Sequence, residues 1–134
     1  MFKKQLLIIF SLWFIAAGAA SAQFDHSHSA WSVLLKKHVA VLDGGKASQL
    51  RYAGMMSDRA QLKSYLDALA KVSDAEFKGF SKNQQLAFLI NAYNANMVEK
   101  ILSRYPHIKS VWDFGKLIGN PFKDNFISLL GRKM

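Results

Sequence analysis

One long stretch of the sequence, residues 82–104, predicts an α-helix around which any fold of this chain must be built. Ser81 followed three residues later by Gln84 is the pattern of a capping box, which satisfies the first free amide groups of a helix. Pro106 marks the other end, because proline disfavours helical geometry in the residue before it. Apolar residues recur at helical spacing, so we expect a broad face of this helix to pack into the core. The members of this apolar arc are Ala87, Phe88, Ile90, Ala95, Met97, Val98, Ile101 and Leu102.

Two asparagines, Asn91 and Asn94, fall inside the apolar arc of this predicted helix. Residues three apart are neighbours on a helix, and an amide buried without a partner costs about 1–3 kcal/mol. We therefore expect both side chains to form hydrogen bonds. A structural role, in which they bind the backbone of a neighbouring loop or strand, is the default because most side-chain hydrogen bonds go to backbone or water. The functional alternative makes them the candidate binding residues of a cleft.

Two further apolar stripes and two capping patterns predict more helices. The stripes cover residues 29–42 and 58–72, and the second begins with a capping-box pattern at Asp58. Ser73 begins another capping pattern, which predicts a short third helix. Gly44 and the glycine after it predict the loop that ends the first helix.

The pattern changes after Pro106, where short elements follow one another. Residues 110–114 indicate a helical turn, and residues 119–121 indicate a second turn. Residues 126–130 indicate a short apolar strand that meets a turn at Gly131, and no returning strand is evident. Either this C-terminal hairpin is incomplete, or residues 126–134 pair backward with an earlier segment or fray. The predicted fold class is α+β and mainly helical.

Residues 1–22 predict an export signal. Lys3 and Lys4 precede an apolar run of about 15 residues, shorter than the roughly 20 that a helix needs to span a bilayer. Ala20-Ser21-Ala22 supplies the small-residue pattern that signal peptidase recognises. We expect cleavage after Ala22, a periplasmic or secreted protein, and no stable membrane span afterwards. The alternative is an uncleaved anchor.

The cysteine content and the charge of the chain limit the kinds of partner that it can bind. The chain has no cysteine, so an exported form depends on its core for stability. Eighteen lysines and arginines against nine acidic residues give a net charge of +9. Because these charges are dispersed and are not interleaved with aromatic residues, we predict no nucleic-acid binding and a surface suited to anionic components of the cell envelope.

Catalytic and metal motifs are not evident. A thiol nucleophile is excluded, the sequence holds no G-x-S-x-G, P-loop or HExxH motif, and its carboxylates are not paired. His26 and His28 would point the same way on an extended segment, but a structural zinc site needs four ligands and no second pair is present. We therefore predict no catalytic residue, no metal site and no cofactor. We expect His38, inside an apolar stripe, to be a satisfied buried histidine.

These residues resemble the domain of unknown function 547 family, which occurs in exported bacterial proteins. The likeness covers nearly the whole chain after Ala22. Its most specific block is Leu86-Ala87-Phe88-Leu89-Ile90-Asn91-Ala92-Tyr93-Asn94-Ala95. The other blocks are residues 25–31, Leu62 with Tyr65-Leu66, Tyr105-Pro106, residues 110–113 and Asn120-Pro121-Phe122.

The export signal and the resemblance together divide the chain into three parts: a signal peptide (1–22), an N-terminal helical region (23–76) and the first part of the family domain (77–134). Family members continue past the equivalent of Gly131-Arg132 into a second strand, a helix bearing Glu and His, and a segment containing cysteine. The resemblance therefore implies a truncated chain.

Three interpretations of the function remain open. The first is an uncharacterised exported protein that is non-catalytic as it stands and acts at most as an envelope binding module. The second is the front half of an exported cysteine-dependent hydrolase, papain-like or transglutaminase-like, whose catalytic residues lie beyond Met134. The third is an inert product of a frameshift or a premature stop.

Overall fold

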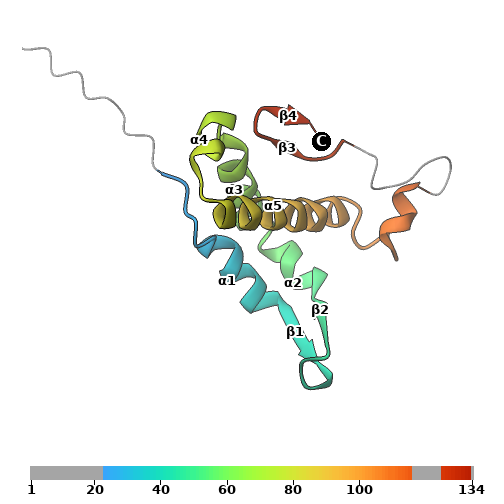
Figure 1. Cartoon of the computed structure of the whole chain (residues 1–134). Coiled ribbons are helices and arrows are strands. Elements are labelled where there is room, and N and C mark those ends of the chain that lie inside the picture. Colours follow the sequence, from blue (N-terminus) through green and yellow to red (C-terminus); the bar gives the residue numbers. More distant parts are fainter. Residues whose placement is uncertain (1–22, 116–124, 134) are drawn as a thin grey trace, which may run out of the picture.

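The computed structural model describes residues 23–115 and 125–133, and their fold is helix-dominated α+β (Figure 1). This confirms the predicted fold class. Two antiparallel hairpins, β1 with β2 and β3 with β4, accompany the helices. The elements in chain order are α1 (Ser29–His38), β1 (Val39–Leu42), the 3₁₀ turn η1 (Asp43–Gly45), β2 (Ala47–Leu50), α2 (Tyr52–Ser57), α3 (Arg59–Lys71), α4 (Asp74–Gly79), α5 (Lys82–Leu102), η2 (Val111–Gly115), β3 (Ser128–Leu129) and β4 (Arg132–Lys133).

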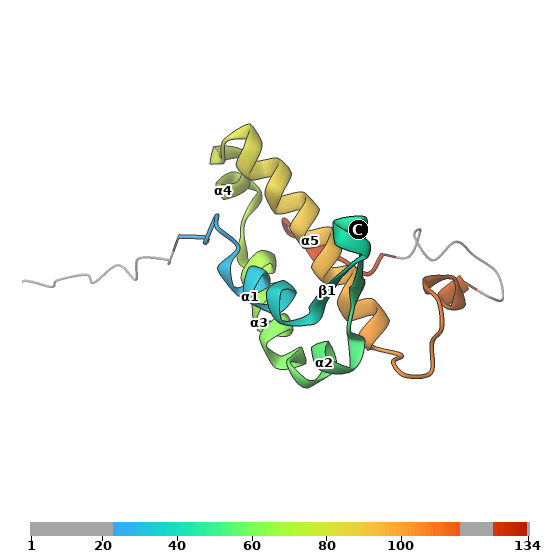
Figure 2. The same ribbon diagram turned by 90° about the horizontal axis from the view of Figure 1, so that it is seen from below.

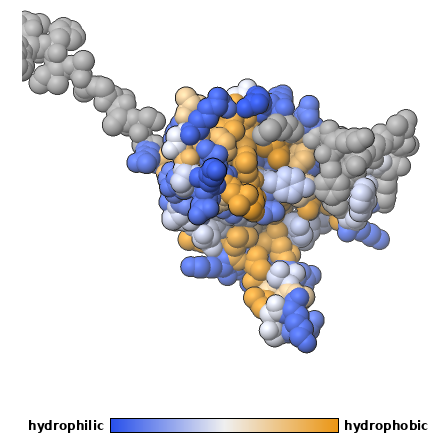
Figure 3. All heavy atoms as spheres, in the orientation of Figure 1, coloured by the Kyte–Doolittle hydropathy of each residue, from blue (hydrophilic) through white to orange (hydrophobic). Residues whose placement is uncertain are grey.

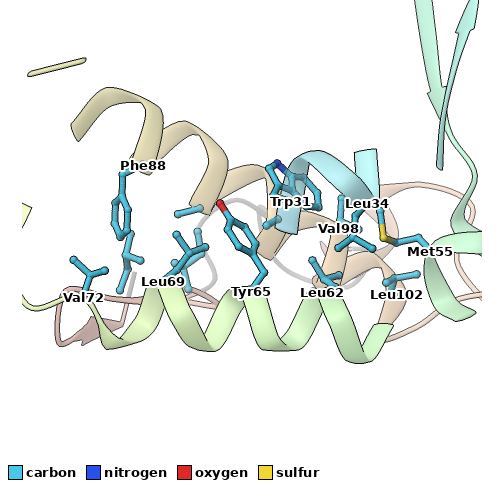
Figure 4. Packing of buried hydrophobic residues seen from close by; sticks show 14 residues of the cluster. Trp31, Leu34, Met55, Leu62, Tyr65, Leu69, Val72, Phe88, Val98 and Leu102 are labelled. Atoms are coloured by element: carbon cyan, nitrogen blue, oxygen red, sulfur yellow. The ribbon is translucent and has the colours of Figure 1, made fainter. Parts of the chain in front are cut away.

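The core lies where α1, α3 and α5 meet (Figure 4). Apolar side chains of α3 point at those of α5, and the side chains of Trp31 and Leu34 from α1 join them. Met55 of α2 is fully buried at one end of this cluster. The cluster runs from Trp31 to Leu129, so residues on both sides of position 76 build one core. Its α3 and α5 members are Leu62, Tyr65, Leu69, Phe88, Ala92, Ala95, Val98 and Leu102.

The predicted capping box of α5 is confirmed, but the predicted apolar arc only in part. Ser81 accepts the amide of Gln84, whose side-chain oxygen accepts the Ser81 amide in return. Ala92 is a core residue that the arc omitted, while Ile90, which the arc included, is 52% exposed. The reason is that α5 is apolar on nearly all sides, so periodicity alone does not single out the buried face.

The first helix is shorter than predicted. Helix α1 ends at His38, and Val39–Leu42 instead forms β1, paired with Ala47–Leu50. The carbonyl of His38 accepts a hydrogen bond from the Arg51 amide at 2.8 Å, which begins the ladder of the hairpin. Gly44 and Gly45, both at positive φ, form its tip. Figure 1 shows the hairpin projecting from the body, and in Figure 2, which views the molecule from below, it points towards the viewer.

Helix α3 has the predicted position, with Asp58 as its N-cap residue, but the predicted capping box does not form. The side chain of Asp58 makes no capping hydrogen bond. Its Oδ2 atom instead lies 2.7 Å from Nε2 of His38 and 2.6 Å from Nζ of Lys37. A carboxylate that binds two basic side chains of α1 is no longer free to cap α3. The cap of α4 is as predicted, since Ser73 accepts the amide of Glu76.

The C-terminal hairpin also differs from expectation, because a returning strand is present. Ser128 pairs with Lys133 and Leu129 with Arg132, around a turn in which Leu130 and Gly131 both have positive φ. The two residues Leu130 and Gly131 reverse the chain between β3 and β4. The helical turn predicted over residues 110–114 is confirmed as η2, and the turn predicted over residues 119–121 lies outside the described residues. Among the described residues, no helix has the length and apolar character that crossing a membrane requires.

Candidate ligand-binding cleft

A cleft of about 560 Å³ lies between the segment that precedes α1 and the exposed side of α3. Its volume falls in the range of roughly 300–1,000 Å³ that is usual for small-molecule sites. Residues of the N-terminal segment and α1 form one wall, and residues from α3 to α4 form the other. The lining residues are Gln23, Phe24, Asp25, His28, Ala30, Ser64, Tyr65, Ala68, Lys71, Val72 and Glu76.

A buried histidine–tyrosine pair joins the two walls. Nδ1 of His28 lies 2.7 Å from the hydroxyl oxygen of Tyr65, and each residue is only 5% exposed. Burial lowers the pKa of His28 and raises the pKa of Tyr65, because both charged forms lose hydration. The pair is therefore neutral at neutral pH, and it can donate or accept hydrogen bonds without carrying charge.

Asp25 fixes the turn that brings His28 to this position. Its two carboxylate oxygens accept hydrogen bonds from the amides and hydroxyls of Ser27 and Ser29, at 2.5 to 2.9 Å. These bonds lower the pKa of Asp25 well below its usual range. The turn also places His28 in the left-handed region, at φ 50°, immediately before α1.

Aromatic contacts hold the N-terminal segment against α5. The ring of Phe24 lies 5.2 Å from that of Phe88 and 6.2 Å from that of Phe80, measured between centroids. It also meets His26 and His28 edge-on, at 5.7 and 5.3 Å. Among the described residues, Nε2 of His28 and Nδ1 of His26 are buried without a hydrogen-bond partner. The segment is thus held by packing, together with the hydrogen bond to Tyr65.

The mouth of the cleft carries both signs of charge, and its interior is largely apolar. Lys71 and Glu76 are exposed at the rim, while Ala68 and Val72 line the wall formed by α3 and the residue that follows it. Ser64 also lines the cleft, but no described histidine or carboxylate accepts a hydrogen bond from its hydroxyl. The cleft therefore has the chemistry of a binding site for a molecule with an apolar body and one hydrogen-bonding group.

The predicted binding residues Asn91 and Asn94 do not line this cleft. Asn91 is half-buried, and Asn94 is exposed, so the expectation of two buried amides is wrong for Asn94. Neither side chain forms a hydrogen bond with another described residue. It is their neighbour Asn96 that binds backbone, through the carbonyl of Ala92 at 2.8 Å.

The other histidines can now be placed. Residues 25–28 form a turn, so His26 and His28 do not share the extended segment that would have pointed them the same way. No group of three or more potential metal ligands occurs in the described part of the chain. The prediction for His38 is confirmed, since it is buried and bound to Asp58.

The sequence analysis did not predict the cleft, although it considered His28 and Tyr65. Periodicity places Tyr65 on the apolar face of its helix and gives no role to its hydroxyl. A buried tyrosine usually finds a hydrogen-bond partner, and that rule was the available signal.

Comparison with protein-family models, curated proteins and solved structures found no match to this chain. The function proposed below therefore rests on the geometry of the cleft and on the family resemblance.

Proposed function

We propose that this protein is an exported, non-catalytic binding module of the domain of unknown function 547 family, and that the cleft between its N-terminal segment and α3 holds its ligand. The observation that carries the proposal is the buried His28–Tyr65 pair at the back of a cleft whose interior is largely apolar. Two separate blocks of the family resemblance, residues 25–31 and Leu62 with Tyr65-Leu66, contribute the two members of this pair.

The chemistry of the pair supports binding over catalysis. A neutral imidazole and a neutral phenol can orient a ligand, but neither is a strong nucleophile. The serine beside them, Ser64, receives no activation from a described base. The ligand that fits has an apolar body and a hydrogen-bonding group that carries no negative charge, because the lining holds the carboxylates of Asp25 and Glu76 against the ammonium of Lys71.

The cleft can be tested with a neutral fluorescent probe, 1-aminoanthracene, and a matched pair of variants of residues 23–134. Ala68 lines the cleft, whereas Ala70 is an exposed alanine of the same helix outside it. Ala68→Trp fills the cleft, and we expect at least a tenfold loss of probe affinity. Ala70→Trp should bind like the parent. Equal affinity in both variants, with unchanged melting temperatures, would refute the cleft as the binding site.

Export and completeness are tested by the intact mass of the protein from its own cells. A mass that matches residues 23–134 supports cleavage after Ala22 and a binding role for the short chain. The mass of residues 1–134 would show an uncleaved chain. A species much heavier than the whole 134-residue chain would overturn the non-catalytic proposal and favour the front half of a cysteine-dependent hydrolase.

A further inference from the structure

An apolar face of α5 is left uncovered by the described chain. Four of its side chains are exposed: Leu86 by 59%, Leu89 by 41%, Ile90 by 52% and Tyr93 by 45%. Their spacing of three, one and three residues puts them on one side of the helix, opposite the core side chains. Figure 3 shows hydrophobic side chains gathered on the face that α5 crosses in Figure 1.

The uncovered face is limited to the first half of the helix. Towards the C-terminal end of α5, Nζ of Lys100 lies 4.2 Å from the centroid of the Phe126 ring and 5.2 Å from that of Phe114. The guanidinium of Arg104 also lies over Phe114, at 4.5 Å. The chain's own aromatic residues thus pack on the second half, and the stripe from Leu86 to Tyr93 remains open.

This stripe is also free of charge. Residues 83–98 contain no lysine, arginine, aspartate or glutamate, although the chain as a whole has a net charge of +9. Two copies of a basic protein repel each other over most surfaces. They can approach along this stripe without bringing like charges into contact.

The spacing of the stripe is the same read in either direction. A twofold axis between Leu89 and Ile90 would therefore set Leu86 against Tyr93 of the second copy, and Leu89 against Ile90 of the second copy. In a twofold interface, every contact between one residue of the first copy and another of the second is repeated with the two copies exchanged. An antiparallel pair of α5 helices meets this condition. Asn83 and Asn94 lie on the same flank of the stripe, where their amides can bind across the rim of such a pair.

We propose that the occupant of this face is a second copy of the chain, and that the protein forms a twofold dimer through antiparallel packing of α5 on α5. Four apolar side chains make a contact smaller than the roughly 800 Å² per partner of a standard interface. The dimer is therefore weak, and it forms at concentrations well above those of a tight complex. This inference does not depend on the ligand proposed for the cleft, since no residue of α5 lines that cleft.

Sedimentation velocity over a wide concentration range tests the dimer, with residues 23–134 because they contain the whole described core. We expect the mass of the parent to rise towards twice the monomer value. Ile90→Glu places a carboxylate beside its own symmetry mate and should weaken association at least tenfold. Val33→Glu is the matched control, since Val33 is a 63% exposed valine of α1 outside the stripe, and it should associate like the parent.

The antiparallel register can be tested because the chain has no cysteine of its own. Leu86→Cys and Tyr93→Cys are prepared separately, mixed and oxidised. We expect the mixture to form a disulfide dimer more completely than either variant alone, since only the mixture places one cysteine against the other. A monomer at every concentration overturns the proposal and assigns the stripe to a different polypeptide. Dimers that Ile90→Glu leaves intact overturn it as well.

Discussion

Nδ1 of His28 lies 2.7 Å from the hydroxyl oxygen of Tyr65, and this contact joins residues 37 positions apart in the chain. It links the turn before α1 to the middle of α3, across the back of the cleft. Because both side chains are buried, the hydrogen bond is protected from competition by water. This hydrogen bond fixes the position of the N-terminal segment on the body more specifically than apolar packing does.

Tyr65→Phe removes the hydroxyl and keeps the ring. We expect the free energy of unfolding to fall by about 1–3 kcal/mol, because Nδ1 of His28 is then buried without a partner. Chemical denaturation measures the change. Tyr93→Phe, at an exposed tyrosine, should stay within about 0.5 kcal/mol of the parent. If Tyr65→Phe were as stable as the parent, the pair would not be bonded in solution.

Acidification should weaken the fold through His28. Its pKa is lowered from the ordinary 6.5, chiefly by burial, although the negative charge of Asp25 opposes this change and His26 adds to it. The unfolded chain then binds the proton more readily than the folded chain. The stability that His28 contributes is full above about pH 6.5. It is lost as the pH falls from there towards the lowered pKa, by at most about 1.4 kcal/mol for each pH unit.

Urea denaturation at several pH values between 5 and 8 measures this loss. His28→Gln should flatten the dependence in that range, whereas His107→Gln, at an exposed histidine, should leave it unchanged. If the free energy of unfolding of His28→Gln depended on pH as steeply as that of the parent, the dependence would come from another group and the prediction for His28 would be wrong.

Gly54→Ala should destabilise the protein, because a Cβ atom at this position would lie 2.6 Å from Nδ1 of the His38 ring. That ring is buried and bound to Asp58, so it cannot move aside freely. We expect a loss of about 1–3 kcal/mol in thermal or chemical unfolding. Gly79→Ala is the control, since nothing lies within 4 Å of its Cβ, and it should be neutral or slightly stabilising. Equal effects would show that the contact with His38 yields without cost.

Glu99→Gln should loosen the contact between α3 and α5. Nε of Arg59 lies 3.1 Å from both carboxylate oxygens of Glu99, and its Nη2 lies 2.6 Å from Oε1. Both side chains are partly buried, so we expect the free energy of unfolding to fall by about 1–3 kcal/mol. Lys78→Gln, which breaks an exposed pair with Asp74 within α4, should have no measurable effect. Losses of similar size would contradict this ranking.

Local signals were predictable from the sequence, and distant ones were not. The helix starts at Ser73 and Ser81 depend on residues three positions away, and both are as expected. The end of α1 at His38 depends instead on pairing with Arg51 across the hairpin, which no local pattern reveals. Asp58 shows the same limit, since its partner His38 lies in another helix and draws it away from the cap.

The candidate site shows the same difference between local sequence signals and contacts made by distant residues. Asn91 and Asn94 interrupt an apolar arc, but that arc contains both a core face and an open face of α5. The side chains of His28 and Tyr65 meet only after α1 and α3 have packed, so their pairing is a property of the tertiary fold. Their separate sequence signals, a histidine near a turn and a tyrosine in an apolar stripe, are too common to indicate a site.

The hairpin of β1 and β2 has a consequence for how the molecule opens. A two-stranded sheet on its own is marginally stable, and this one is joined to the body near Arg51, whose amide and guanidinium bind the carbonyls of His38 and Lys37. We expect its amide protons to exchange with solvent well before those of the core, as a separate unit of local unfolding. Its tip at Gly44 points away from the body (Figure 1), so a fluorophore or a peptide tag inserted there should leave the cleft and α5 undisturbed.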